Sequence, residues 1–137
     1  MTVTADEINA YLAGAFPGTG NECAEVGPTW AVGRYAVEPD RLRPGGFISG
    51  PTQFGLADAV LWYALFGAVG IEPMALTSEL SIRYLRPAAG AVLWARADLH
   101  AAGRRNVVGS VKLWVDDASD RVVSVAQGAY VRPAGPG

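Results

Sequence analysis

The residue whose type and position most clearly indicate chemistry is Asp58, the only charged side chain between Pro51 and Ile71. Its neighbours are apolar, and moving an ionised carboxylate away from water is costly unless a partner compensates. Two interpretations stay open at this point. Asp58 either bonds a nearby backbone group or faces a subunit interface, or it acts as a general base or nucleophile in a partly dry cleft.

A second candidate feature lies just before this stretch, where Ser49 and Gly50 precede Pro51. If a helix begins here, its unpaired N–H groups and its dipole favour a developing negative charge, as in an oxyanion hole. Proline has no N–H, so the candidate donors are the amides of Gly50 and Thr52. Eight helical residues at about 1.5 Å each put Asp58 roughly 12 Å along the axis from Gly50. If both serve one reaction, Asp58 of one subunit must face Gly50 of another across a two-fold interface.

The sequence excludes several other kinds of site. With one cysteine, Cys23, and one histidine, His100, the chain can form neither an internal disulfide nor a Cys/His metal cluster. We expect no metal and no cofactor. Nucleophile-elbow, P-loop, dinucleotide-binding and zinc-protease motifs are absent. A Ser-His-Asp triad would have to use His100, which has no serine placed persuasively near it in the sequence.

Charge and hydropathy limit the partners. The 11 basic and 13 acidic side chains leave a net charge of -2, which gives no reason to expect nucleic acid or an anionic membrane as a partner. The N-terminus lacks a basic start followed by an apolar run, and the uncharged apolar run 59–71 is shorter than the roughly 20 residues of a membrane helix. We therefore expect a cytoplasmic protein without a membrane segment.

The elements that position these residues follow from local patterns. At 137 residues, half of them hydrophobic, the chain predicts one domain over residues 1–132, followed by a disordered tail at 133–137. Thr4 and Glu7 form a capping box before a short amphipathic helix. Residues 23–37 indicate a strand with a bend at Gly27-Pro28, and the turn-rich segment 40–50 indicates a loop.

The remaining pattern predicts one long helix and four strands. Between Pro51 and Gly70 the residues are apolar all round, which is typical of a helix buried on nearly every side. Strand-like segments follow at 76–85, 92–99, 106–115 and 122–131. Because consecutive strands joined by short turns pair antiparallel, we predict an α+β fold in which a curved antiparallel sheet of five to six strands rolls around the helix.

Two segments resemble a known family. The helix GPTQFGLADAVLWYA after a glycine-rich loop, and the strand ending SIRYLRPAAG, are similar to the PaaI-like acyl-CoA thioesterases of the hotdog fold over about residues 43–131. The combination of L-A-D on the helix with Y-L-R-P-A-x-G after it is the most specific part. The resemblance implies a helix wrapped by an antiparallel sheet, a homodimer that often pairs into a homotetramer, and a coenzyme A thioester as substrate.

Residue by residue, the resemblance puts the family's catalytic carboxylate on Asp58 and its oxyanion-binding glycine on Gly50. A hydroxyl residue that orients the attacking water falls on Thr77, with Ser78 as the alternative. The implied reaction is hydrolysis of an acyl-CoA to coenzyme A and a free acid. Asp58 either activates water or adds directly to form a mixed anhydride, and the sequence leaves both routes open.

Two positions depart from the family pattern, because Ser49 replaces the usual histidine and Arg43 replaces the usual asparagine or glutamine. These departures motivate the main alternative, a non-hydrolytic hotdog protein that binds acyl-CoA or a related ligand. A hotdog hydratase would depend on His100, and a purely structural assembly domain is the third alternative.

Further substrate-binding candidates are grouped by the part of the substrate that they would contact. Arginines suit the coenzyme A phosphates, and aromatic side chains near Asp58 suit the acyl pocket. The phosphate candidates are Arg86, Arg104 and Arg105, and the acyl-pocket candidates are Phe54, Trp62 and Tyr63. We expect the other tryptophans to be core or interface residues.

Overall fold

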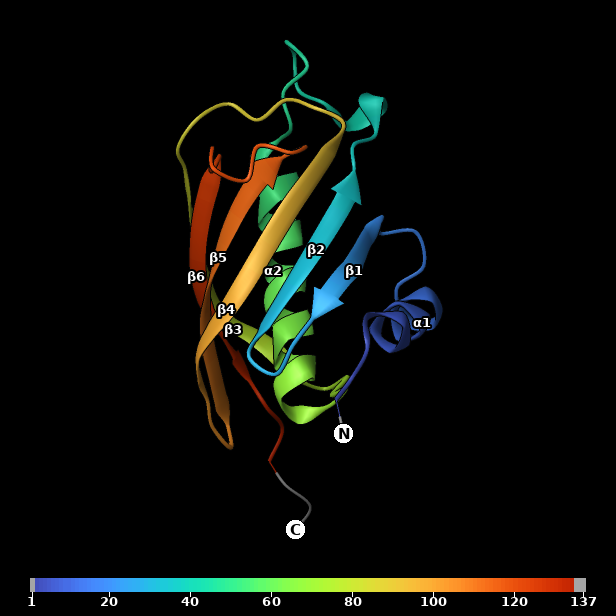
Figure 1. Cartoon of the computed structure of the whole chain (residues 1–137), viewed down its shortest axis with the longest axis vertical. Coiled ribbons are helices and arrows are strands. Elements are labelled where there is room, and N and C mark those ends of the chain that lie inside the picture. Colours follow the sequence, from blue (N-terminus) through green and yellow to red (C-terminus); the bar gives the residue numbers. More distant parts are fainter. Residues whose placement is uncertain (1, 135–137) are drawn as a thin grey trace.

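The computed structural model describes residues 2–134, and these form two α-helices, one short 3-10 helix and six strands. In chain order the elements are α1 (Ala5–Ala15), β1 (Asn21–Val26), β2 (Trp30–Ala36), η1 (Pro39–Arg41), α2 (Gly50–Val69), β3 (Leu76–Tyr84), β4 (Val92–Ala102), β5 (Asn106–Val115) and β6 (Ser124–Val131). The sheet curves around α2, and α1 lies beside β1 (Figure 1). This is the predicted hotdog architecture. Of the expected tail, residues 135–137 lie outside the described part of the chain.

Both helices begin where the sequence indicates. Thr4 and Glu7 form the predicted capping box of α1. The Ser49 side chain caps α2, a proline occupies its first turn, and Gly70 ends it with a φ of 98°. By length and composition α2 would be able to cross a membrane, but half of its apolar window is buried inside the fold, as in the core helix of a soluble protein.

The expectation that α2 is buried on nearly every side was only partly right. Its inner faces are fully covered, but one stripe at helical spacing stays open within this chain. Pro51, Phe54 and Gly55 are exposed on that stripe, and Asp58 and Trp62 continue it as half-buried residues. The carboxylate therefore lies at the edge of the core.

The strand order is β1-β2-β4-β5-β6-β3, all neighbours being antiparallel. Residues 23–37 are two strands rather than one bent strand, because Gly27 N–H bonds the Trp30 carbonyl and closes a hairpin. Consecutive pairing also fails at β3, which bonds β6, while the segment before β4 crosses the end of the sheet (Figure 1). Within residues 2–134 the other edge of β3 is unpaired.

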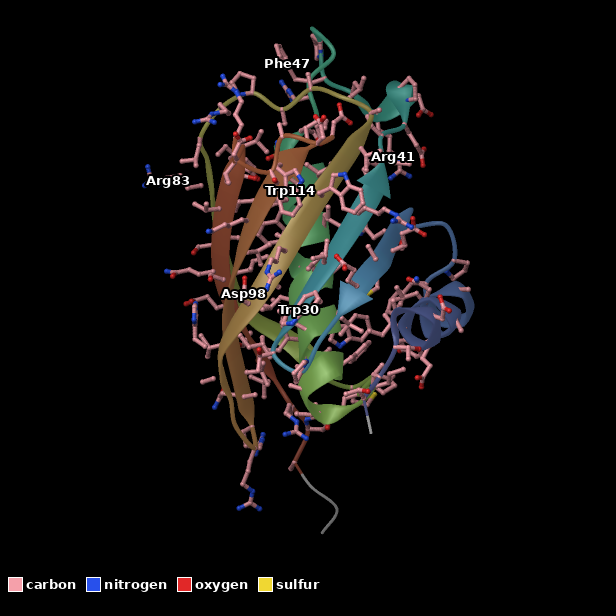
Figure 2. All side chains as sticks on the ribbon, in the orientation of Figure 1. Trp30, Arg41, Phe47, Arg83, Asp98 and Trp114 are labelled. Carbon is pink, nitrogen blue, oxygen red and sulfur yellow. The ribbon has the colours of Figure 1, made fainter. Side chains whose placement is uncertain are left out.

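Three of the four tryptophans, Trp30, Trp94 and Trp114, lie half-buried on the outer face of the sheet, where Trp94 stacks on Trp114. Figure 2 labels Trp30 and Trp114 on this face. The Arg96 guanidinium lies 4.7 Å from the ring centre of Trp30, and that of Arg34 lies 5.5 Å from the ring centre of Trp94. The arginines cover the rings of Trp30 and Trp94, and Trp114 stacks on Trp94, so the three residues belong to a surface layer and not to the core beneath the sheet.

Candidate active site

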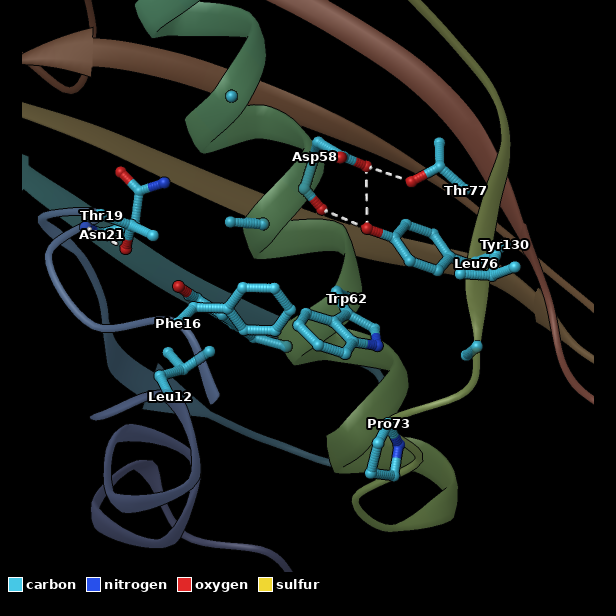
Figure 3. Close-up of a pocket in the computed structure, with 14 residues that line it drawn as sticks. Leu12, Phe16, Thr19, Asn21, Asp58, Trp62, Pro73, Leu76, Thr77 and Tyr130 are labelled. Atoms are coloured by element: carbon cyan, nitrogen blue, oxygen red, sulfur yellow. Dashed lines mark hydrogen bonds between the residues drawn. The ribbon is translucent and has the colours of Figure 1, made fainter. Parts of the chain in front are cut away.

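Asp58 is held by two hydroxyl groups. Its Oδ1 accepts a hydrogen bond of 2.7 Å from Thr77 Oγ1 and one of 2.8 Å from the Tyr130 hydroxyl (Figure 3). The Tyr130 hydroxyl also lies 3.0 Å from the Asp58 carbonyl oxygen. Hydrogen bonds to an ionised carboxylate offset part of its loss of hydration, so these donors explain how the charge is tolerated beside the core.

The register of two strands brings these hydroxyls together. Thr77 of β3 and Tyr130 of β6 are directly paired across the sheet. A bulge follows in β3, where Ser78 has no partner in the register and its hydroxyl donates to the Ala129 carbonyl at 3.1 Å. Of the two hydroxyl residues that the sequence proposed, the structure therefore places Thr77 against Asp58 and Ser78 elsewhere.

Asp58 lines a cavity of about 280 Å³ between α1, α2 and β3 (Figure 3). Most of its walls are apolar or aromatic, and Trp62 and Phe16 meet edge to face there, with ring centres 5.7 Å apart. The lining residues are Leu12, Phe16, Thr19, Asn21, Gly55, Asp58, Ala59, Trp62, Tyr63, Pro73, Ala75, Leu76, Thr77 and Tyr130. The indole N–H of Trp62 is buried without a hydrogen-bond partner among residues 2–134. A small apolar group fits such a cavity, with Asp58 at its polar side.

Burial shapes the ionisation of the two tyrosines of this cavity. Burial has the largest effect and the negative charge of Asp58 the second largest, and both raise the pKa of Tyr130 above its ordinary value of 10.0. Burial likewise raises the pKa of Tyr63. Both hydroxyls therefore stay protonated at neutral pH, and that of Tyr130 is available as a donor.

The start of α2 leaves one amide free for a ligand. The Ser49 hydroxyl accepts the Thr52 N–H at 3.2 Å, so one of the two donors that the sequence proposed is already used by the helix cap. Residues 2–134 offer no acceptor to the Gly50 N–H. The Tyr84 hydroxyl donates to the Gly50 carbonyl at 2.8 Å and holds this end of the helix against β3. Gly50 is thus the amide that the fold leaves available.

A buried polar pair anchors the same helix start to the sheet. Ser124 of β6, which is fully buried, donates to Gln53 Oε1 at 2.8 Å. The Gln53 amide nitrogen donates to the Ile48 carbonyl at 3.2 Å. Because these buried groups satisfy one another, they fix the backbone just before Gly50. Gly50 and Asp58 stay at separate places on one uninterrupted helix, and Gly50 does not line the cavity.

The remaining substrate-binding candidates are dispersed. Phe54 is exposed on α2 outside the cavity, whereas Trp62 lines it. Arg43 is exposed in a turn closed by its N–H bond to the Phe47 carbonyl, near the start of α2. Arg86 is also at that end, since the neighbouring Ala88 carbonyl accepts the Ile48 N–H. Arg104 and Arg105 occupy the β4–β5 turn.

The arginines therefore form two groups at opposite ends of α2. The Arg105 carbonyl accepts the Arg132 N–H, and the Arg132 side chain pairs with Glu72 just beyond the end of α2. One chain cannot apply Arg86 and Arg105 to the same phosphate.

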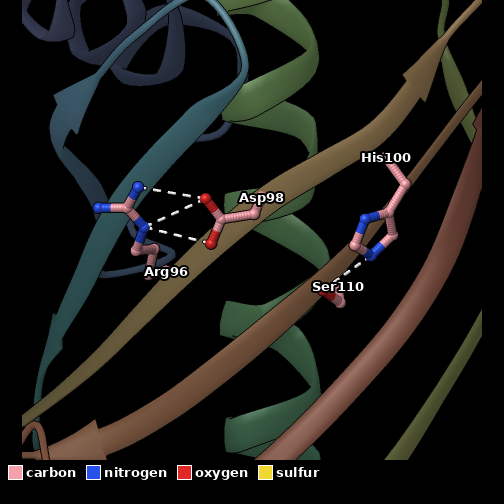
Figure 4. Close-up of polar contacts among 4 residues, drawn as sticks. All are labelled: Arg96, Asp98, His100 and Ser110. Atoms are coloured by element: carbon pink, nitrogen blue, oxygen red, sulfur yellow. Dashed lines mark hydrogen bonds and ion pairs between the residues drawn. The ribbon is translucent and has the colours of Figure 1, made fainter.

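His100 has a serine partner, contrary to the sequence-based expectation. Its Nε2 lies 3.0 Å from Ser110 Oγ, which antiparallel pairing of β4 with β5 brings alongside (Figure 4). The nearby carboxylate of Asp98 instead bonds Arg96 at 3.1 Å. No acid orients the imidazole, and the pair does not line the cavity, so a Ser-His-Asp mechanism lacks its third member in the described residues.

Sequence reasoning missed three residues of this region: Gln53, Tyr84 and Tyr130. A signal existed for Tyr130, because alternate residues of β6 point inward and a tyrosine at such a position needs a partner for its hydroxyl. Tyr84 and Gln53 had no comparable signal, since their contacts depend on how the helix start meets the sheet. No group of three or more metal-binding side chains occurs within residues 2–134.

Comparison with known proteins agrees with this fold. The family model of the thioesterase superfamily matches residues 45–123, more than half of the chain. Comparison with the curated proteins found no match. A candidate thioesterase from a Silicibacter species is 28% identical, with a TM-score of 0.86 over 98% of this chain and 95% of that one.

Two more distant structures share the fold. The PaaI protein from the phenylacetic acid degradation operon of E. coli is 23% identical, with a TM-score of 0.74 over 96% of this chain and 90% of its own. Zebrafish thioesterase superfamily member 2 is 16% identical, with a TM-score of 0.81 over 96% of this chain and 100% of its own. At these identities the likeness supports the fold alone.

Proposed function

The chain belongs to the thioesterase superfamily, and we propose that it hydrolyses acyl-CoA thioesters at the cavity beside Asp58, releasing coenzyme A and a free carboxylic acid. Membership of the family indicates thioester hydrolysis as the general activity. The observation that carries the proposal is the hydroxyl-held carboxylate at the wall of an apolar cavity. Such a group is held in place by its hydrogen bonds and partly shielded from water, as a general base or nucleophile must be.

Two routes are compatible with this site. In the first, Asp58 removes a proton from water while the water oxygen adds to the thioester carbonyl carbon. The intermediate then expels the coenzyme A thiolate, which takes up the proton. In the second, a carboxylate oxygen of Asp58 adds to the carbonyl carbon and expels the thiolate, and water hydrolyses the resulting anhydride. Thiolate is a good leaving group, so neither route needs a strong general acid.

The oxyanion donor in this proposal is the Gly50 amide of a second subunit. Its support is the free edge of β3, beside which Met74 and Leu76 are 70% and 68% exposed. A two-fold axis near the middle of β3 would pair this strand with its own copy. Thr77 would then face the Tyr84 end of the second copy, and Tyr84 is the residue that holds Gly50. One symmetry operation would thus complete two equivalent sites.

The cavity volume bears on the acyl group. An engineered protein cavity of about 150 Å³ accommodates benzene, so about 280 Å³ suits a compact acyl group such as a short chain or a single substituted ring. The aromatic walls formed by Phe16 and Trp62 favour the ring. The coenzyme A portion would remain outside the cavity, and the exposed arginines Arg86, Arg104 and Arg105 stay the candidates to bind its phosphates.

One observation favours a second candidate function, acyl-CoA binding without hydrolysis. Ser49 stands where the family's histidine is usual, and its hydroxyl is engaged in capping α2. The same hydroxyl lies 2.8 Å from Thr52 Oγ1, and when it donates to that oxygen it has no proton left for a thioester carbonyl. A site with a base but a weakened oxyanion hole would bind the substrate and turn it over slowly.

The test is a thiol-release assay over short, medium-length and aromatic acyl-CoAs. We expect wild type to release thiol and Asp58→Asn to lose roughly 100-fold or more in kcat while still binding the substrate by calorimetry. The matched control is Asp98→Asn, which removes the same charge from the outer face of the sheet and should leave kcat unchanged. If wild type and Asp58→Asn both bind acyl-CoA and neither releases thiol, the binding protein is the correct function.

A further inference from the structure

The Tyr130 hydroxyl lies inside the protein and points at the Asp58 carboxylate. Tyr130 is only 4% exposed, and its ring fills an inward position of β6 against α2. The hydroxyl lies 2.8 Å from Oδ1 and 3.0 Å from the carbonyl oxygen of the same residue. Both of these acceptors belong to Asp58, so this buried donor serves that residue.

The two hydroxyls that reach Asp58 converge on one oxygen. Thr77 and Tyr130 both donate to Oδ1, and no donor among residues 2–134 reaches Oδ2. This pairing stops rotation of the carboxylate about its last bond, since turning it would break two hydrogen bonds at once. Oδ2 is therefore the oxygen left for water or substrate.

We propose that Tyr130 is a positioning residue, which with Thr77 fixes Asp58 through Oδ1 and leaves Oδ2 as the reacting oxygen. This inference rests on the proposed hydrolase function for its kinetic consequence. The Tyr130 hydroxyl bonds Oδ1 and the carbonyl oxygen of Asp58, so it acts on the reaction through Asp58. A neutral hydroxyl suits this role because it donates a hydrogen bond to the ionised carboxylate without cancelling its charge.

The surroundings keep this donor protonated. Burial, and next the nearby carboxylate charge, raise the pKa of Tyr130 above 10.0, so the hydroxyl does not ionise at working pH. The ionisable groups that face the carboxylate across the cavity are Tyr130 from β6 and Tyr63 from α2 itself. Burial raises the pKa of Tyr63 as well, and Thr77 from β3 is uncharged. Among the described residues that line this cavity there is no basic side chain and no carboxylate besides Asp58.

The test compares two buried tyrosines that each lose a hydroxyl. Tyr130→Phe removes the donor to Asp58. Tyr35→Phe is the matched control, because Tyr35 is 3% exposed and its hydroxyl has no partner in the described part of the chain. Aspartate labelled with ¹³C at Cγ gives an NMR signal for Asp58, identified by its loss in Asp58→Asn. We expect this signal to move in Tyr130→Phe, which loses a hydrogen bond to Oδ1, and to stay in place in Tyr35→Phe. An unmoved signal in Tyr130→Phe, or an equal movement in both variants, overturns the proposal.

Kinetics give the second readout. We expect Tyr130→Phe to lower kcat about tenfold with little change in KM, and Tyr35→Phe to leave both unchanged. If wild type hydrolyses no thioester, the proposed function fails, but the NMR comparison still decides the role of Tyr130. If Tyr130→Phe does not fold, the ¹³Cζ signal of Tyr130 is followed in Asp58→Asn and Asp98→Asn. Movement in the first variant alone supports the contact, and movement in neither overturns it.

Discussion

A two-subunit site predicts that two inactive variants restore each other. Asp58→Asn removes the carboxylate, and Gly50→Pro removes the free amide at the start of α2. Proline is tolerated in a first helical turn, and Ser49 already has the extended conformation, with φ −67° and ψ 156°, that a residue before proline prefers. The Tyr84 hydroxyl must shift slightly, because a Cβ at position 50 would lie 3.0 Å from it. We expect each variant alone to keep about 1% of wild-type activity or less.

The activity expected in a mixture of the two variants follows from random pairing of the subunits. In an equimolar mixture about half of the dimers contain one chain of each kind, and each mixed dimer has one site with both Asp58 and Gly50 intact. About a quarter of all sites are then functional, so activity should rise to about a quarter of wild type. If Asp58 and Gly50 of the same chain formed the site, every site would carry one defect and activity would not rise.

The assay is thiol release after the differently tagged variants are unfolded and refolded together. Mixed dimer isolated through both tags has one functional site of two and should reach about half of wild-type activity. The control mixes Asp58→Asn with Thr77→Val. Thr77 bonds Asp58 of its own chain at 2.7 Å, so every site in that mixed dimer keeps a defect and no recovery is expected. Recovery in the control, or no recovery with Gly50→Pro, would refute the two-subunit site.

Two further predictions concern the cavity and the fold. Phe16→Ala should open the cavity beside α1 and raise the kcat/KM ratio of longer to shorter acyl-CoAs at least about tenfold, whereas Phe47→Ala, which removes an exposed ring away from the cavity, should leave this ratio unchanged. Burial raises the pKa of the Cys23 thiol from 9.0 to about 12, so the stability that the neutral thiol contributes is complete below pH 9.0 and is lost as the pH rises toward about 12. By scanning calorimetry, Tm should therefore fall less between about pH 8 and about pH 10.5 in Cys23→Ala than in wild type, and equal falls would contradict this assignment.

The elements with local signals were predictable from the sequence. Thr4 and Glu7 lie within one helical turn of each other, and the capping box that they form was confirmed. The start and end of α2 follow from Ser49, Pro51 and Gly70 in the same way. The hotdog fold was confirmed because it depends on such signals and on the wrapped apolar helix. Gly27-Pro28 was interpreted as a bend although it closes a hairpin, since the residue types of the two turns overlap.

What depends on contacts distant in the sequence was not predictable. Pairing of β3 with β6 is decided by how the sheet closes around α2. The two strands are not joined by a turn, so no local sequence signal indicates this pairing. The position of Tyr130 opposite Thr77 follows from that pairing, and the bulge at Ser78 decides which hydroxyl meets Asp58. The sequence could name the carboxylate from its isolation among apolar residues, but not the donors that hold it.

The exposed stripe of α2 and the free edge of β3 are two apolar surfaces that a single chain leaves uncovered. A hydropathy pattern records that a residue is buried in the working protein, but not which chain buries it. The sequence indicated a helix buried on nearly every side, whereas one chain leaves Phe54 37% exposed on α2 and Leu76 68% exposed at the edge of β3. A second copy placed on this side would cover both surfaces at once. It would also remove water from the side of the cavity where Asp58 lies, which strengthens every electrostatic interaction there. On the proposed two-subunit site, burial of α2 and completion of the site would occur together, on dimerisation.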